Sequence, residues 1–272
     1  MERIKEALER ARKERQEQGL GDAETVSAGV EVPTKTDSLK EIQYTQTRVV
    51  DVSPSLLKDK RVVAMQQNDV VKDAYKMLRT QILQRMRENG WNTLAITSPR
   101  AGEGKTLTAV NLAISLASEG NQTVLLVDLD LRRPGVHTLF SHQPEKGISD
   151  YLTENTPLSE ILFNPGIDRL VIVPAGAPIV DSSELLSTQR MIDLVKELKQ
   201  RYPSRLVLFD LPPLLLTDDA LAFLPNVDAA LMVLEEGKTQ EEDMLHAVEL
   251  MQGTAVLGTV LNKAEVAKQR VY

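Results

Sequence analysis

Leu94-Ala-Ile-Thr-Ser-Pro-Arg-Ala-Gly-Glu-Gly-Lys-Thr106 is the stretch of sequence that decides the fold. It is typical of a short buried strand, a tight turn and the start of a helix. Gly102 and Gly104 let the backbone approach phosphate oxygens, and successive N–H groups at a helix N-terminus form a nest for an anion. Lys105 can reach the β- and γ-phosphates, and the Thr106 hydroxyl can bind Mg²⁺. The predicted nucleotide-binding residues of this phosphate-binding loop (P-loop) are Gly102, Glu103, Gly104, Lys105, Thr106 and Leu107.

The loop departs from the usual pattern at its first position. A glycine normally stands five residues before the final glycine, and this chain has Pro99 there. The motif is therefore a variant P-loop, and the rest of the chain decides what it means.

Composition limits the classes of protein to consider. The chain has 272 residues, of which 42% are hydrophobic, and this suits one α/β domain with extensions or two small domains. A net charge of −7 argues against a dedicated nucleic-acid binder, and the lack of cysteine excludes disulfides and thiolate metal sites. No apolar run approaches the ~18 residues of a membrane span, and the N-terminus lacks a signal-peptide core. We expect a cytoplasmic chain that reaches a membrane only through a partner.

Three regions are expected along the chain. Residues 1–18 are predicted to form a charged helix with a thin apolar stripe, which is either a solvated helix or a docking helix for a partner. Residues 19–60 are polar, lack a sustained period and are interpreted as a flexible linker in which Arg48–Leu57 adds a short edge segment. Residues 61–272 are predicted to form the folded domain.

Strands and helices alternate through that domain. Strands are predicted over Leu94–Thr97, Thr123–Asp128, Leu170–Pro174, Arg205–Asp210, Ala229–Leu234 and Ala255–Leu261. Long helices are predicted over 68–89, 105–119, 183–202 and 239–252, the last opened by the capping box Thr239-x-x-Glu242. Short helices are predicted near 137–140, 149–152, 158–162 and 218–224. The alternation predicts an α/β fold of the P-loop NTPase class, a mostly parallel sheet with helices on both faces.

Carboxylates follow two of these apolar strands. Asp128 and Asp130 leave one strand with a single residue between them, and Asp210 ends another in the Walker B arrangement. Ligands bind at the carboxyl ends of parallel strands, so these acids are expected to face the P-loop. Thr106, Asp128 and Asp210 are the predicted Mg²⁺ ligands, and one acid of the first pair can accept a proton from an attacking hydroxyl.

The nucleotide is expected to be ATP. Asn262 and Lys263 follow the last strand, where the base would lie, and an asparagine there can pair with an adenine edge. Ala264-Glu265 follows instead of the x-Asp of a guanine-selecting Asn-Lys-x-Asp motif. The predicted cofactors are therefore ATP and Mg²⁺, with Asn262 at the base.

Taken together, these motifs resemble the bacterial tyrosine kinases of polysaccharide assembly, in their separate cytoplasmic form. The similarity runs from about Asn68 to Glu265. Its specific points are Asp73-Ala-Tyr-Lys-Met-Leu-Arg-Thr80, the P-loop, Asp128-Leu-Asp-Leu-Arg-Arg-Pro134 with His137, Pro174-Ala-Gly176, Glu184-Leu-Leu186, Asp210-Leu-Pro-Pro213 and Asp219-Ala220.

The resemblance implies ATP-dependent autophosphorylation on tyrosine within a ring of subunits, activated by a membrane-spanning chain-length adaptor. It implies that Lys105, Asp128, Asp130 and Asp210 are the catalytic residues. The family's ring contact is a helix with Glu-x-x-Arg-x-x-Arg, which is Asp73-x-x-Lys76-x-x-Arg79 here. Only Tyr272 stands where the family has a C-terminal tyrosine cluster. Either Tyr272 is the autophosphorylation site, or another protein is the substrate, or the kinase activity has been replaced by an ATPase switch.

Two alternatives accompany this interpretation. The first is an ATP-driven dimerising switch of the partition and septum-positioning type, in which the residue at the position of Arg100 reaches across a dimer to the partner's nucleotide. Arg100 could also be an ordinary solvent-facing loop residue. The second alternative is a structural module with a vestigial site, and the presence of Lys105, Thr106 and all three aspartates argues against it.

Overall fold

The structure is a computed structural model that describes residues 47–63, 70–201 and 204–264. All of these belong to one compact unit, Ser38–Tyr272. The predicted helix over 1–18, the linker up to residue 46 and Tyr272 lie outside the described residues.

Eight strands form one sheet in the order β1-β4-β5-β3-β6-β2-β7-β8. The strands are β1 (Arg48–Val49), β2 (Thr93–Thr97), β3 (Thr123–Asp128), β4 (Phe163–Asn164), β5 (Leu170–Val173), β6 (Arg205–Asp210), β7 (Ala229–Glu235) and β8 (Ala255–Asn262). All neighbouring pairs are parallel except β4 and β5. The predicted mostly parallel sheet is confirmed.

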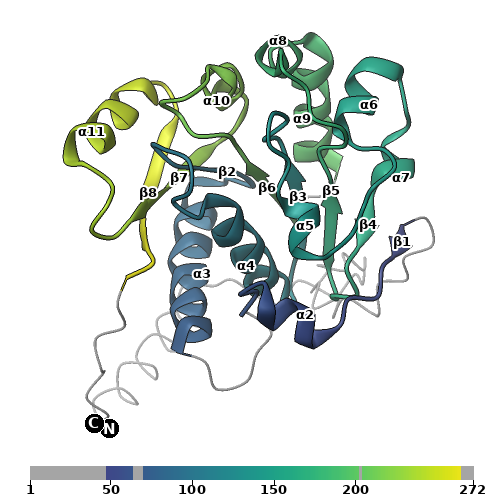
Figure 1. Cartoon of the computed structure of the whole chain (residues 1–272), viewed down its shortest axis with the longest axis horizontal. Coiled ribbons are helices and arrows are strands. Elements are labelled where there is room, and N and C mark those ends of the chain that lie inside the picture. Colours follow the sequence, from purple (N-terminus) through teal and green to yellow (C-terminus); the bar gives the residue numbers. More distant parts are fainter. Residues whose placement is uncertain (1–46, 64–69, 202–203, 265–272) are drawn as a thin grey trace, which may run out of the picture. The chain divides into compact units, whose positions relative to one another are not determined.

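Helices cover both faces of the sheet (Figure 1). They are α2 (Pro54–Asp59), α3 (Val70–Asn89), α4 (Lys105–Ala117), α5 (Val136–Leu139), α6 (Ile148–Glu154), α7 (Leu158–Ile161), α8 (Ser182–Leu186), α9 (Gln189–Arg201), α10 (Asp219–Phe223) and α11 (Glu241–Leu250), and a short 3₁₀ turn η1 (Leu224–Asn226) follows α10.

Side-chain alternation along the strands builds two apolar layers. In β3, Val124 and Leu126 pack into the layer that contains α2, α3 and α4, whereas Leu125 and Val127 pack into the layer that contains α6 to α11. Strands buried on both faces need continuous apolar sequence, which β3 has.

The strand order brings the predicted motifs together. β6 lies between β3 and β2, so the P-loop after β2 and the acids that end β3 and β6 come from three adjacent strands. Asp210 pairs in register with Asp128 on one side and with Ile96 on the other. The topology therefore assembles the site at one edge of the sheet.

Two local predictions were wrong, and one short strand was not predicted. The helix predicted over 183–202 is two helices, α8 and α9, because the chain breaks at Ser187 and the Thr188 hydroxyl accepts the Met191 N–H at 3.3 Å to open the second. Thr239 does not cap the last helix, which begins at Glu241 with Gln240 as its N-cap. The strand that was not predicted is β4, which has only two residues.

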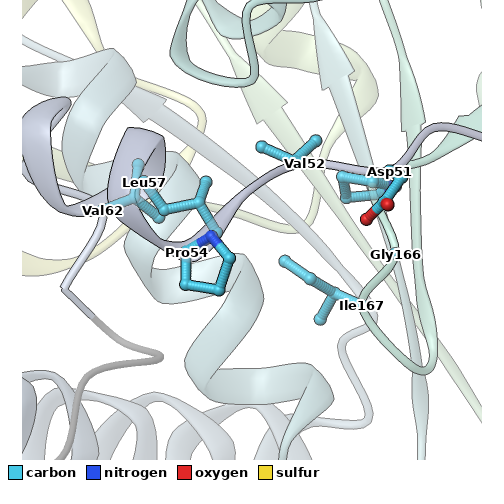
Figure 2. Close-up of a pocket in the computed structure, with 8 residues that line it drawn as sticks. Asp51, Val52, Pro54, Leu57, Val62, Gly166 and Ile167 are labelled. Atoms are coloured by element: carbon cyan, nitrogen blue, oxygen red, sulfur yellow. The ribbon is translucent and has the colours of Figure 1, made fainter.

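The folded part of the chain begins before residue 61. The edge segment predicted over Arg48–Leu57 is present, since β1 pairs with β4 and Leu57 of α2 is buried in the core. A cavity of about 220 Å³ lies between the α2 segment and the Pro165–Ile167 loop (Figure 2). That loop precedes β5, so the cavity lies at the amino end of the sheet, opposite the P-loop.

Candidate nucleotide site

The P-loop has the backbone that an anion nest requires. Gly102 has φ of 86° and Gly104 has φ of 91°, in the left-handed region that favours glycine. Gly104 is the N-cap of α4, and no side chain caps that helix. The N–H groups of the first turn of α4 are therefore available to a ligand.

Proline fits the first position of the variant loop because the backbone hydrogen bonds at residues 98 and 99 use carbonyl oxygens. The Ser98 and Pro99 carbonyl oxygens accept the N–H groups of Leu214 and Leu215 at 2.9 and 3.1 Å. These contacts require no N–H from residue 99, and proline has none. The segment after β6 thus holds the start of the loop.

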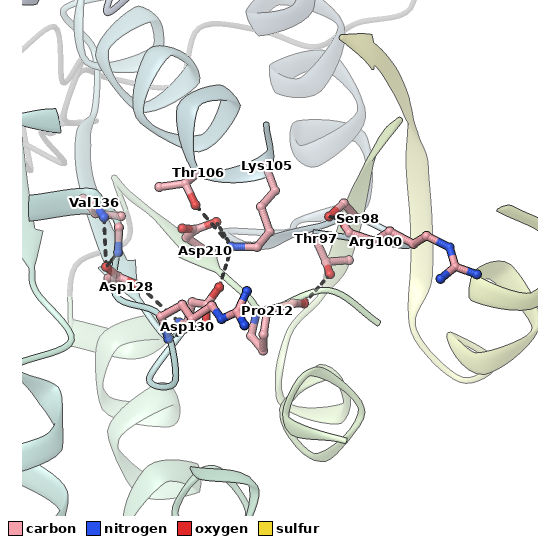
Figure 3. Close-up of polar contacts among 12 residues, drawn as sticks. Thr97, Ser98, Arg100, Lys105, Thr106, Asp128, Asp130, Val136, Asp210 and Pro212 are labelled. Atoms are coloured by element: carbon pink, nitrogen blue, oxygen red, sulfur yellow. Dashed lines mark hydrogen bonds and ion pairs between the residues drawn. The ribbon is translucent and has the colours of Figure 1, made fainter. Parts of the chain in front are cut away.

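Lys105 lies among the predicted carboxylates (Figure 3). Its Nζ donates to Asp130 Oδ2 at 2.8 Å and lies 3.8 Å from Asp210 Oδ1. The Thr106 hydroxyl is 3.2 Å from the same Nζ. The structure thus brings together the lysine, the hydroxyl and two of the three acids that the sequence predicted.

Asp128 supports the loop that follows β3. Its Oδ2 accepts the N–H groups of Gly135 and Val136 at 3.0 Å each, and its Oδ1 accepts the N–H of Asp130 at 3.2 Å. The fully buried carboxylate therefore shapes the segment that carries Asp130. Its place as a metal ligand stays a prediction.

Asp210 differs from Asp128 in its partners. It is fully buried, and neither of its carboxylate oxygens has a hydrogen-bond partner. Its nearest charge is the Lys105 ammonium at 3.8 Å, and a buried carboxylate without hydrogen bonds is costly for the folded protein. Such groups in a native structure commonly serve a ligand, and a cation would satisfy both oxygens.

Burial sets the protonation of the cluster. It raises the pKa of Asp128 to about 7, with the nearby Asp210 charge adding to the effect. Burial also raises the pKa of Asp210, although Lys105 opposes the shift. Burial lowers the pKa of Lys105, but the charges of Asp210 and Asp130 outweigh it, so the net pKa is raised and the lysine stays charged.

A hydroxyl–carboxylate contact that the sequence did not predict supports the loop. Glu103 is 2% exposed; its Oε2 accepts the Arg100 N–H at 2.9 Å and its Oε1 accepts the Thr239 hydroxyl at 2.5 Å. The same hydroxyl accepts the Glu235 N–H at 2.8 Å. The sequence indicated only a capping role for Thr239, because no motif or spacing relates it to Glu103, 136 residues away.

Replacing Thr239 by valine should destabilise the fold by about 1–3 kcal/mol, because a buried carboxylate and a backbone N–H each lose a partner. Urea unfolding of the full chain measures this. Thr80→Val is the matched control, since the exposed Thr80 hydroxyl donates to the Lys76 carbonyl where water can replace it. We expect less than about 0.5 kcal/mol there. Equal effects of both substitutions would contradict the role of the Thr239–Glu103 contact.

The remaining predicted residues lie near the loop. Asn262 Nδ2 donates to the Glu103 carbonyl oxygen at 2.8 Å, so its amide contacts the P-loop itself. Arg100 is 57% exposed and binds Asp243 of α11 through two nitrogens, at 2.5 and 2.7 Å. On α3, Lys76 pairs with Asp73 at 2.8 Å, while Arg79 turns to the Ser115 carbonyl of α4.

The described ranges contain neither a membrane-spanning helix nor a metal site made of side chains alone. No helix there has the length and apolar character needed to cross a membrane. No group of three or more histidines or acids there is arranged to hold a metal ion alone. Mg²⁺ in nucleotide sites normally keeps few protein ligands and is completed by phosphates and water.

The fold and the site define a P-loop nucleotide-binding protein. The AAA domain family matches residues 91–252. The septum site-determining protein MinD from Pyrococcus horikoshii, solved with Mg-ADP, shares the fold with a TM-score of 0.53 at 22% identity, over 65% of this chain and 72% of that one.

Closer relatives identify the family. The tyrosine-protein kinase YwqD of Bacillus subtilis is 31% identical over 216 residues, which cover 78% of this chain and 90% of YwqD. The tyrosine-protein kinase CpsD of Streptococcus agalactiae is 31% identical over 73% of this chain and 86% of its own length. The kinase domain of the Escherichia coli tyrosine kinase ETK superposes with a TM-score of 0.71 at 28% identity, over 83% of this chain and 91% of that one. The chain belongs to the bacterial tyrosine-protein kinases.

Proposed function

We propose that this chain is an ATP-dependent tyrosine autokinase that regulates exopolysaccharide or capsule biosynthesis and export. The observation that carries the proposal is the cluster beside the P-loop in which one buried lysine pairs with Asp130 and Asp210, with the buried Asp128 near enough to affect its pKa. Phosphoryl transfer depends on positioning and on electrostatic stabilisation, and this cluster offers both.

The residues present fit a magnesium–nucleotide complex. Both oxygens of Asp210 are buried without a hydrogen bond, the Thr106 hydroxyl lies beside Lys105, and the uncapped start of α4 offers N–H donors to phosphate. Mg²⁺ held by Thr106 and Asp210 would neutralise charge on the transferring phosphoryl group. Asp128 is proposed to contribute to this site through the segment that it holds.

Asp130 is the better placed of the two acids after β3 to receive the proton of a tyrosine. Its side chain is 8% exposed, whereas Asp128 is fully buried and bonded to three backbone N–H groups. Asp130 Oδ2 currently accepts from Lys105. If Lys105 turned to a phosphate, that oxygen would become free to accept a proton.

The switch alternative receives less support. It requires Arg100 to reach the nucleotide of a second subunit, but here the guanidinium forms two hydrogen bonds to Asp243 of its own chain. That contact uses two of the five N–H donors that a guanidinium carries. The kinase family to which the chain belongs favours tyrosine phosphorylation.

We also propose that the kinase acts as a homo-oligomer at the inner membrane, bound to a membrane adaptor rather than inserted. Support comes from the family and from the solved chimerical protein CapA2B2, which has a TM-score of 0.70 at 25% identity. On helix α3, Asp73 and Lys76 are exposed for the proposed subunit contact, whereas Arg79 binds the Ser115 carbonyl and Glu119 of its own chain.

Tyr272 is the proposed acceptor, and its removal tests the proposal. Full-length chain incubated with its adaptor and Mg·ATP should gain phosphotyrosine, and Tyr272→Phe should remove most of that signal. Phosphopeptide mass spectrometry measures the occupancy of each of the five tyrosines. An undiminished phosphotyrosine signal in Tyr272→Phe would show that another tyrosine is the acceptor. A wild-type chain that binds Mg·ATP but never gains phosphotyrosine would refute the kinase proposal.

A further inference from the structure

Two successive carbonyl oxygens of the P-loop are held by side chains from the end of β8. Lys263 Nζ donates to the Gly102 carbonyl at 2.7 Å, and Asn262 Nδ2 donates to the Glu103 carbonyl at 2.8 Å. The end of β8 is itself fixed to the end of β7, because the Glu236 N–H donates to the Asn262 carbonyl at 2.9 Å. The loop is thus held from outside by a neighbouring part of the sheet.

Holding a carbonyl also orients an N–H group. A trans peptide is planar, so its N–H points away from its C=O. The bond from Lys263 to Gly102 therefore sets the direction of the Glu103 N–H, and the bond from Asn262 to Glu103 sets that of the Gly104 N–H. Both N–H groups belong to the turn that opens α4, where phosphate oxygens bind.

The loop needs such support because of its glycines. Gly102 and Gly104 adopt positive φ, and glycine visits both signs of φ with little difference in energy. The Asn262 amide also packs closely on the loop: a Cβ at Gly104 would lie 2.1 Å from Asn262 Nδ2. Between the two glycines, the Glu103 side chain is held by Thr239.

We propose that Asn262 and Lys263 are positioning residues that hold the P-loop peptides so that the N–H groups of Glu103 and Gly104 face the polyphosphate. Asn262 thereby acts on phosphate binding and does not select the base. This inference rests on the nucleotide site of the proposed function and is independent of the tyrosine that accepts the phosphate.

The chain contains a natural control for Lys263. Glu235 Oε2 pairs with both Lys263 and Lys238, at 2.9 and 3.3 Å. Lys238 is 64% exposed, and within the described residues its ammonium pairs with Glu235 and forms no hydrogen bond to the P-loop. Removing either lysine takes one cation from Glu235, yet only Lys263→Ala frees the Gly102 carbonyl.

Calorimetric binding of Mg·ADP, Mg·GDP and Mg·pyrophosphate to the full chain tests the proposal. Lys263→Ala and Asn262→Ala should weaken all three ligands by a similar factor of about ten or more, while Lys238→Ala stays within about twofold of wild type. Wild-type pyrophosphate affinity in Lys263→Ala would overturn the proposal. So would an Asn262→Ala variant in which only the preference for ADP over GDP changes, because that result assigns Asn262 to the base.

A second readout does not depend on ligand. Without nucleotide, the backbone amide resonances of Glu103 and Gly104 should shift in Lys263→Ala more than those of other loop residues, and they should stay in place in Lys238→Ala. Unshifted amides in Lys263→Ala would count against the proposal.

Conservative variants separate loop orientation from loss of folding. Lys263→Arg keeps a donor and should recover most of the binding, whereas Asn262→Asp keeps the size but presents a carboxylate to the Glu103 carbonyl and should bind as weakly as Asn262→Ala. Lys263→Arg as weak as Lys263→Ala would overturn the role of the donor. If these variants bind nucleotide more weakly but the wild-type chain never gains phosphotyrosine, this inference holds and the kinase proposal fails.

Discussion

Lys105→Met should lower tyrosine phosphorylation by about 100- to 1,000-fold, which is the usual loss when one preorganised donor to a reacting group is removed. Lys105 is 9% exposed and is bonded to Asp130, so it is already at the site when the nucleotide arrives. Initial rates of phosphotyrosine formation at saturating Mg·ATP give the size of the loss. A methionine variant within tenfold of wild type would exclude Lys105 from the reaction.

Lys105→Met should also weaken the fold, because Lys105 is the cation that pairs with Asp130 and Asp210. Breaking a buried ion pair by removing one partner costs about 3–5 kcal/mol. Lys105→Arg is the control: it keeps the charge, so it should retain more stability than methionine. The planar guanidinium of arginine does not reproduce the compact ammonium of lysine, so the activity of Lys105→Arg should remain low. The comparison separates loss of activity from loss of structure.

The sequence predicted the centre of the fold well because its signals there are local. A continuous apolar run identifies β3, and the glycine-bearing turn before Lys105 identifies the start of α4. Parallel strands place their carboxyl ends along one edge, so the grouping of Asp128 and Asp210 near Lys105 followed from the strand assignments.

The contacts between distant segments could not be predicted in the same way. Thr239 and Glu103 are 136 residues apart, and Lys263 and Gly102 are 161 apart, so no periodicity or spacing relates them. The capping box at Thr239 was a sound local pattern that a tertiary contact overrode, because the buried Glu103 carboxylate needs a donor more than the exposed helix start needs a cap.

The order of strands in the sheet places Asn262 beside the P-loop. Asn262 lies at the end of β8, and β7 separates β8 from β2, which leads into the P-loop. The sequence placed Asn262 near the nucleotide, but the turn between Gly102 and Gly104 comes within hydrogen-bonding distance first. Asn262 therefore contacts the P-loop, a contact that the sequence did not predict, and its place at the base stays a prediction.

Asp210→Asn should abolish catalysis and yet stabilise the protein without ligand. Loss of the proposed Mg²⁺ ligand should lower phosphotyrosine formation by about 100-fold or more, because a metal ion supplies several kcal/mol of transition-state stabilisation. The gain in stability arises because the cost of burying the Asp210 carboxylate exceeds the attraction of Lys105, as its raised pKa indicates, and the neutral replacement also removes repulsion from Asp128.

The pH dependence of this gain has a defined sign. A carboxyl whose pKa is raised on folding binds its proton more tightly in the folded state, so the free energy of unfolding falls as pH rises above the unfolded value of 3.8. For Asp128 this fall continues to about pH 7. The midpoint of thermal unfolding of Asp210→Asn should therefore exceed that of wild type most clearly at pH 8, and the difference should shrink as pH falls towards 4.

Asp228→Asn is the control with the opposite sign. Burial raises the pKa of Asp228, but hydrogen bonds from Lys199, Thr93 and the Asn92 N–H outweigh it and leave the pKa lowered. Asparagine at 228 should therefore lower the midpoint at pH 8. If both variants lose stability, Asp210 is an ordinary structural carboxylate. The other outcome is that only Asp210→Asn gains stability and that Mg·ADP no longer raises its unfolding midpoint. The folded wild-type protein then holds an unfavourable charge at Asp210 that a bound cation offsets, so this position lowers stability in favour of binding.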